Sequence, residues 1–170
     1  MSAPVMRGAQ RVGLLGDLDD VERLAVRWLR HWDRDPEGQA ALVTSLGMAL
    51  GQDRARNVSG VFADLMEIGQ QFGRRQLCRH GLYCDCLGAD EAVFAHIVEA
   101  ASNGETEDAA MLASLIVRPD MALCFSGLAA EFGIALAAFA RSVPKHRRRP
   151  MPSRPSTRES HKAADPRTLH

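Results

Sequence analysis

The sequence predicts an all-α fold: an irregular bundle of five or six helices forming one domain. Apolar residues recur every three or four positions along successive segments, which is the period of amphipathic helices. The chain is rich in alanine, leucine and glycine and only 5% aromatic, a mixture that suits close packing of helices. No segment alternates apolar and polar residues as half-buried strands do. The length of 170 residues fits a single domain.

The first helix is the clearest. Asp17 precedes it and is expected to cap it, because an aspartate oxygen can accept hydrogen bonds from the first free N–H groups of a helix. Its apolar positions share one face: Leu18, Val21, Leu24, Ala25, Trp28, Leu29 and Trp32. Both tryptophans lie on that face, so we expect them to anchor the core rather than to bind a ligand.

The other helices are marked by caps, glycines and prolines. Asp35 followed by Pro36 is typical of a helix start, and Gly51 and Gly73 are typical of helix ends. The helices expected after the first cover residues 36–50, 53–72, 89–102, 106–118 and 119–142.

The last of these segments could be either a membrane-spanning helix or a core helix. Residues 121–140 include one charged residue, Glu131, and are long enough to span a bilayer. The segment is rich in alanine and glycine rather than leucine, and a charge at its middle would oppose insertion. We therefore expect a buried core helix.

The net charge of zero is the sum of two parts of the chain with opposite charge. Residues 1–140 carry a charge of about −7, and residues 141–170 carry about +7. We expect three parts: a flexible lead-in over residues 1–16, a helical domain over 17–142, and a disordered basic tail over 143–170. Five prolines among arginines leave the tail too little apolar surface to fold. The tail is either a solvated extension or a contact for nucleic-acid phosphates.

Chemistry is concentrated in the loop between the third and fourth helices. Cys78, His80, Cys84 and Cys86 lie within nine residues, and thiolate and imidazole groups are the ligands that zinc prefers. Cys84 and Cys86 also stand just before a helix, whose positive N-terminus favours thiolates. The sequence predicts a structural metal site here, with zinc as the cofactor.

Other interpretations of the loop stay open. His96, on the fourth helix, could replace Cys78 as a ligand. The cysteines could form a redox switch, could be packing residues, or could supply a reactive Cys84–His80 pair. Cys124 lies among apolar residues of the sixth helix, and we expect it in the core.

These observations favour a small, non-enzymatic regulatory or adaptor protein that acts through a protein partner. The chain has no phosphate-binding glycine loop, nucleophile elbow or HExxH motif. It has no secretory signal pattern at its start, so we expect it in the cytoplasm, where thiols stay reduced. A redox-sensing regulator and a nucleic-acid-associated factor using the basic tail are the alternatives. The pattern leaves the oligomeric state open.

Overall fold

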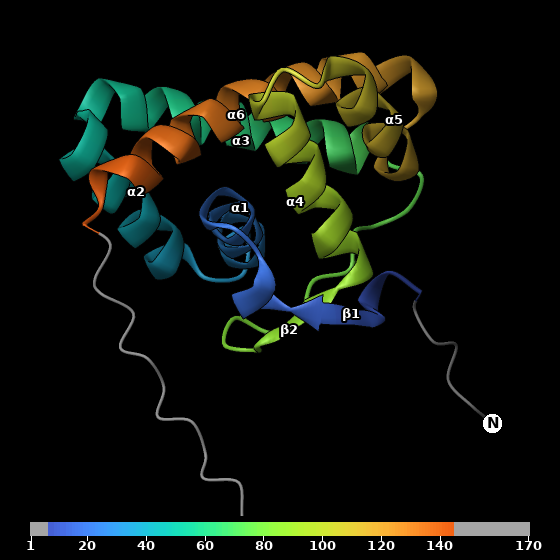
Figure 1. Cartoon of the computed structure of the whole chain (residues 1–170), viewed down its shortest axis with the longest axis horizontal. Coiled ribbons are helices and arrows are strands. Elements are labelled where there is room, and N and C mark those ends of the chain that lie inside the picture. Colours follow the sequence, from blue (N-terminus) through green and yellow to red (C-terminus); the bar gives the residue numbers. More distant parts are fainter. Residues whose placement is uncertain (1–6, 145–170) are drawn as a thin grey trace, which may run out of the picture.

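The computed structural model describes residues 7–144 and confirms the all-α irregular bundle. Within that range it contains six α-helices and one small antiparallel sheet (Figure 1). The helices are α1 (Asp20–His31), α2 (Pro36–Leu50), α3 (Gln52–Phe72), α4 (Ala89–Ser102), α5 (Thr106–Ile116) and α6 (Ala122–Ser142). The strands are β1 (Arg11–Leu14) and β2 (Cys86–Gly88), and short 3-10 turns cover Arg7–Ala9, Leu15–Asp17 and Pro119–Met121.

Helix α1 begins with a capping box. Asp19 Oδ1 accepts from Glu22 N at 2.8 Å, and Glu22 Oε2 accepts from Asp19 N at 3.2 Å. The expected cap, Asp17, was wrong, since it ends the preceding 3-10 turn. The reciprocal pair explains the difference, because only Asp19 has a glutamate three residues later.

Helices α2 and α3 begin and end close to the predicted positions. Asp35 caps α2 by accepting from Gly38 N at 3.0 Å, with Pro36 in the first turn. Gly51 then has φ of +94°, a conformation that suits glycine, and lets the chain turn directly into α3.

An aromatic cluster forms the centre of the bundle. Trp28 lies 5.3 Å from Phe62 and 5.5 Å from Phe132 between ring centroids, and Phe62 lies 4.8 Å from Phe132. Phe94 and Phe125 extend the cluster to α4 and the start of α6. The five rings come from α1, α3, α4 and α6, so burying them holds these four helices together.

Helix α6 packs against α1, α3, α4 and α5. One of its faces is buried through Phe125, Ala129, Phe132 and Leu136, as expected for a core helix. Within the described range, the segment Pro119–Ser142 is also the one that could cross a membrane by length and composition. Of its most apolar window 44% is buried in the bundle, while Leu123 and Ile134 are exposed.

The small sheet is a departure from the sequence prediction. Strand β1 pairs antiparallel with β2, with Arg11 opposite Gly88 and Leu14 opposite Cys86, and Ala89 N donates to Gln10 O at 2.9 Å. In Figure 1 the two strands lie side by side beneath α1 and α4, at the end of the molecule away from α3 and α6.

The expectation of a flexible lead-in over residues 1–16 therefore fails for residues 7–16. Backbone hydrogen bonds to β2 hold these residues. Such bonds do not depend on the side chains, so no apolar period in the sequence predicts them. Helix α6 ends at Ser142, where the helical domain was predicted to end. Residues 1–6 and 145–170, which include nearly all of the predicted basic tail, lie outside the described residues.

Candidate metal centre

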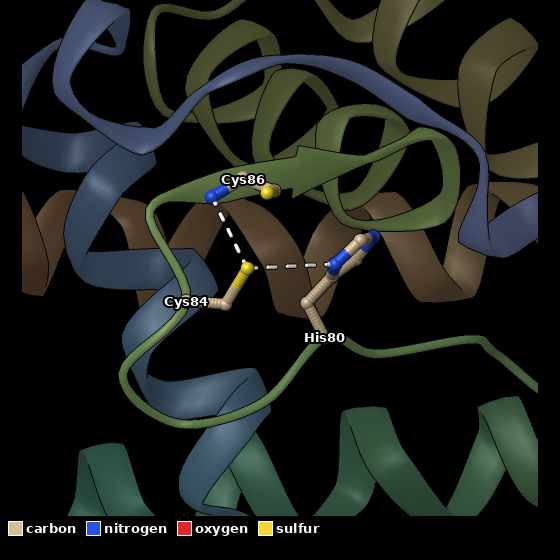
Figure 2. Close-up of side chains that lie close together, drawn as sticks. All are labelled: His80, Cys84 and Cys86. Carbon is tan, nitrogen blue, oxygen red and sulfur yellow. Dashed lines mark hydrogen bonds between the residues drawn. The ribbon is translucent and has the colours of Figure 1, made fainter.

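Three of the four predicted ligands come together. One ligand atom from each of His80, Cys84 and Cys86 lies within 4.8 Å of the other two. Figure 2 shows Cys84 pointing from the loop toward the His80 ring, with Cys86 at the start of β2 beside them. All three residues are half-buried, so an ion held by them would remain reachable from solvent.

One distance in this group is close to the separation of two ligands on a tetrahedral ion. Bond lengths of about 2.3 Å to sulfur and 2.0–2.1 Å to nitrogen place a thiolate and an imidazole about 3.6 Å apart on one zinc ion. The distance between Cys84 Sγ and His80 Nδ1 is 3.8 Å. An ion could enter between these two groups with a shift of a few tenths of an ångström.

The His80 ring is held in the tautomer that a metal requires. Its Nε2 lies 2.9 Å from the carbonyl oxygen of Ala9. A carbonyl oxygen only accepts hydrogen bonds, so Nε2 carries the proton and donates it. In the neutral ring Nδ1 then has the lone pair, and it is the nitrogen that faces Cys84. A hydrogen bond from the other ring nitrogen is the usual means of orienting a histidine ligand.

Gly88 makes room for this ring. A Cβ atom at position 88 would lie 2.7 Å from His80 Cδ2 and 2.9 Å from His80 Nε2. Any side chain there would push the imidazole away from Ala9. The two-strand sheet therefore serves the site directly, since Ala9 precedes β1 and Gly88 ends β2.

The two thiols of the loop differ in acidity. The pKa of Cys84 is lowered, first by a hydrogen bond with the Cys86 side chain, then by the Cys86 N–H at 3.3 Å and by His80. The pKa of Cys86 is raised, first by the same side-chain hydrogen bond and then by burial. Cys84 is therefore the better thiolate donor, and Cys86 retains the proton that the two sulfurs share.

A buried arginine holds the loop in place. Arg30, on α1, donates from Nη1 to Cys84 O at 2.6 Å and to Gly81 O at 3.2 Å, and from Nη2 to Cys86 O at 2.6 Å. Its remaining N–H groups donate to Glu91 Oε1 at 2.8 Å and Oε2 at 2.9 Å. All five donors of the guanidinium are used, so the loop backbone has one conformation that satisfies Arg30.

Glu91, in the first turn of α4, completes this support. Its carboxylate accepts from His80 N at 2.9 Å and from Gly88 N at 3.0 Å. Burial alone would raise the pKa of Glu91, but the hydrogen bonds from Arg30, Gly88 and His80 outweigh it and hold the pKa below its ordinary value. The carboxylate is thus ionised and binds the backbone of His80 rather than its ring.

Sequence reasoning missed Arg30, Ala9 and Gly88. Arg30 follows the apolar residues Trp28 and Leu29, and its complete burial was the signal available only in three dimensions. Ala9 contributes a backbone carbonyl, which no side-chain pattern could indicate.

The structure places the fourth predicted ligand, Cys78, outside the three-residue group. Its backbone N–H donates to Asp90 Oδ2 at 2.8 Å, and Asp90 also accepts from Arg75 at 2.5 Å. Cys124 is exposed on α6, so the expectation of a core position for it was wrong. The sixth helix buries the face that carries Phe125 and leaves the neighbouring face in solvent.

His96 belongs to a different cluster. Its ring, with Glu22 of α1 and Glu99 of α4, forms a second group whose ligand atoms lie within 4.8 Å of one another. A hydrogen bond with Asp19, burial, and the nearby charges of Asp19 and Glu22 raise the pKa of Glu99 to about 7. His96 thus stands with carboxylates rather than with the cysteines.

A groove lies against the other side of the loop. It has a volume of about 370 Å³ and is lined by Leu29, Trp32, Met66, Gly69, Gln70, Gly73, Arg75, Gln76, Leu77 and Arg79. The predicted core residue Trp32 is only half-buried here, and its indole Nε1 has no hydrogen-bond partner among residues 7–144. Arg79 joins the groove to α1 by donating to Trp32 O at 2.6 Å and Leu29 O at 3.0 Å.

Comparisons of the chain with protein-family models, with curated proteins and with solved structures gave no match.

Proposed function

We propose that this chain is a small cytoplasmic metal-binding protein, with zinc as the ion held by His80, Cys84 and Cys86. The ion would join the loop to β2 and so stabilise the junction between α3 and α4. The protein would act without catalysis, as a regulator or adaptor for a protein partner. A reducing compartment suits this role, since it keeps the thiols available to the ion.

The observation that carries the proposal is the preorganised His80 nitrogen. A lone pair on Nδ1, fixed by the bond from Nε2 to Ala9, faces the more acidic thiol at 3.8 Å. The Cys84 sulfur is the partner of Nδ1, so the two candidate ligand atoms face each other directly. A metal ion supplies the positive charge that this nitrogen and the Cys84 thiolate both favour.

The fourth position of a tetrahedral ion would be open to water or to a partner's side chain. Cys78 lies outside the three-residue group, with its backbone N–H bound to Asp90. Closed structural zinc sites use four protein ligands, so three ligands from this chain leave one position to be filled. It offers a route by which a partner could bind the ion directly.

Metal content tests the proposal. Protein purified without added metal or nickel affinity resin is analysed by elemental mass spectrometry, beside the double variant Cys84→Ser/Cys86→Ser. We expect about one more zinc per chain in the unaltered protein than in the double variant. We also expect a strong chelator to lower the melting temperature of the unaltered protein only.

Cys124→Ser is the matched control, because Cys124 is exposed and outside the loop. It should keep the full zinc content. Equal metal content in all three proteins, with loop thiols that titrate freely before chelation, would refute the metal site.

A redox switch is the second candidate, and the contrast between the two thiols favours it. Cys84 is the more acidic thiol, and its sulfur lies within 4.8 Å of that of Cys86. A thiolate beside a protonated thiol is the arrangement from which oxidation begins. Under this alternative the protein folds fully without metal, and mild oxidants form a reversible disulfide in the loop.

The proposed protein partner would bind near the loop. The groove beside it is lined by the apolar residues Leu29, Met66 and Leu77 together with Trp32 and two arginines, a mixture found at partner-binding surfaces. Loop residues line the groove, so binding of an ion could alter its shape. The alternative of nucleic-acid binding rests on the basic tail, which lies outside the described residues. It predicts binding that weakens steeply with salt.

A further inference from the structure

A second cluster of ligand groups joins α1 to α4, on residues separate from the cysteine loop. One ligand atom from each of Glu22, His96 and Glu99 lies within 4.8 Å of the other two. His96 and Glu99 are three residues apart on α4, so their side chains share a helix face. Glu22 reaches them from the first turn of α1.

Glu22 is the informative residue in this cluster. Its side chain is 8% exposed, yet its Oε1 has no hydrogen-bond partner among the described residues. His96 Nδ1 lies 2.5 Å from that oxygen, but the contact does not meet the geometry of a hydrogen bond. The other oxygen, Oε2, is occupied by the capping bond from Asp19 N. A buried carboxylate oxygen whose close partner is a ring nitrogen off hydrogen-bond geometry is poorly satisfied, and an ion at this point, with the His96 ring moved back, would satisfy it.

The surroundings are strongly acidic. Asp19 lies close enough to Glu99 to share a hydrogen bond with it. Within residues 7–144 no arginine forms an ion pair with Glu22 or Glu99, although Arg141 lines the same shallow hollow. Three carboxylates therefore gather around one imidazole, His96, which forms the cluster's ion pair with Glu22 when its ring is protonated.

We propose that Glu22, His96 and Glu99 form a second metal site, which takes a divalent first-row transition ion such as Mn²⁺ or Zn²⁺. Two carboxylates and one imidazole suit such ions, whereas the thiolates of the loop favour softer ones. The ion would join the start of α1 to the middle of α4, on residues that do not contact the cysteine loop.

Manganese separates the two sites experimentally, because Mn²⁺ prefers oxygen and nitrogen ligands to thiolates. Chelator-treated protein is titrated with Mn²⁺, and free Mn²⁺ is measured by its electron paramagnetic resonance signal. We expect one bound Mn²⁺ per chain. The variants Glu99→Gln and His96→Asn should each raise the dissociation constant by about tenfold or more.

Three controls make the result decisive. Glu107→Gln removes an exposed acidic residue from the first turn of α5 and should bind as the unaltered protein does. Cys84→Ser/Cys86→Ser should also bind as before, so the site stands or fails independently of the proposed zinc loop. Circular dichroism and melting temperature establish that each variant is folded.

Three outcomes would overturn the second site. One is the absence of Mn²⁺ binding by the unaltered protein. Another is equal weakening by Glu107→Gln and Glu99→Gln, which would indicate general attraction to acidic side chains. The third is loss of Mn²⁺ in the cysteine variant, which would place the ion in the loop.

Discussion

Arg30 and Glu91 form a two-point ion pair in which both side chains are buried, with Nε–Oε1 at 2.8 Å and Nη2–Oε2 at 2.9 Å. The pair links α1 to the first turn of α4, and both partners use their other hydrogen bonds on the backbone between His80 and Gly88. The buried Arg30–Glu91 pair therefore fixes the backbone conformation of the candidate site.

Replacing Arg30 should lower the stability of the protein. Arg30→Ala leaves the Glu91 carboxylate buried without its partner and removes the donor from three loop carbonyls. We expect the free energy of unfolding to fall by about 3–5 kcal/mol, as is usual when one member of a buried pair is lost. Urea denaturation followed by circular dichroism measures the change.

The matched control is Arg56→Ala, which breaks an exposed pair with Asp53 on α3. Exposed pairs contribute little to stability, so we expect the urea midpoint to stay close to that of the unaltered protein. Similar midpoints for the two variants would contradict a supporting role for Arg30.

Gly88→Ala should weaken metal binding while leaving the fold intact. The added methyl group would meet the His80 ring at 2.7 Å and displace it from Ala9. Loss of such an orienting contact usually lowers metal affinity by about 10–100-fold. Competition with a chromophoric zinc chelator measures the affinity.

Gly81→Ala is the control for that experiment, since a methyl group at position 81 meets nothing within 4 Å. It lies in the same loop and should keep the affinity of the unaltered protein. If both alanine variants bind zinc equally well, the Ala9–His80 contact does not orient the ligand.

The fold was predictable because its main determinants are local. The cap Asp35 and the turn at Gly51 lie within a few residues of the helix ends that they determine. The apolar period of α1 includes Trp28, which is buried in the core. Strand β1 was missed because its partner, β2, has three residues and lies far along the chain. A strand that short offers no alternation to detect.

The candidate site was predictable only in its residue types. The spacing of cysteines identified the loop, and the structure brings Cys84, Cys86 and His80 together. The spacing in the sequence could not separate Cys78 from the other three residues, because the bond from Cys78 N to Asp90 depends on how α4 packs. The same is true of His96, which pairs with Glu22 of a distant helix.

Acid should weaken the packing of Cys78 through Asp90. Burial alone would raise the pKa of Asp90, but hydrogen bonds from Arg75 and Cys78 N outweigh it and hold the pKa below its ordinary value. A carboxylate with a lowered folded pKa contributes its full stability above the unfolded value, about 3.9. That contribution is lost as the pH falls from there through the folded pKa.

Melting temperatures at pH 6 and pH 3 test this expectation. Asp90→Asn removes the titrating group, so its melting temperature should fall less between the two pH values than that of the unaltered protein. Asp64→Asn, at an exposed position of α3, should show the same fall as the unaltered protein. An undiminished fall in Asp90→Asn would rule out Asp90 as a source of the acid sensitivity.

Cys84 should be the most reactive thiol of the metal-free protein at neutral pH. Its pKa is lowered first by the hydrogen bond with Cys86, then by the Cys86 N–H and by His80, so a larger fraction is thiolate. Iodoacetamide labelling in the presence of a chelator, followed by peptide mass spectrometry, gives the rate for each cysteine. The exposed Cys124 serves as the internal reference, and we expect Cys84 to react faster even though it is half-buried.

His80→Asn separates the cause of this reactivity from simple access. Loss of the imidazole removes one of the groups that lower the pKa of Cys84, so its labelling should slow while that of Cys124 stays constant. Zinc added before the reagent should protect Cys84 and Cys86 and leave Cys124 reactive, because a bound thiolate is no longer a free nucleophile. Labelling of Cys124 ahead of Cys84, unchanged by His80→Asn or by zinc, would show that the loop neither activates a thiol nor holds the ion. Both the metal proposal and the redox alternative need an acidic Cys84, so that result would count against each of them.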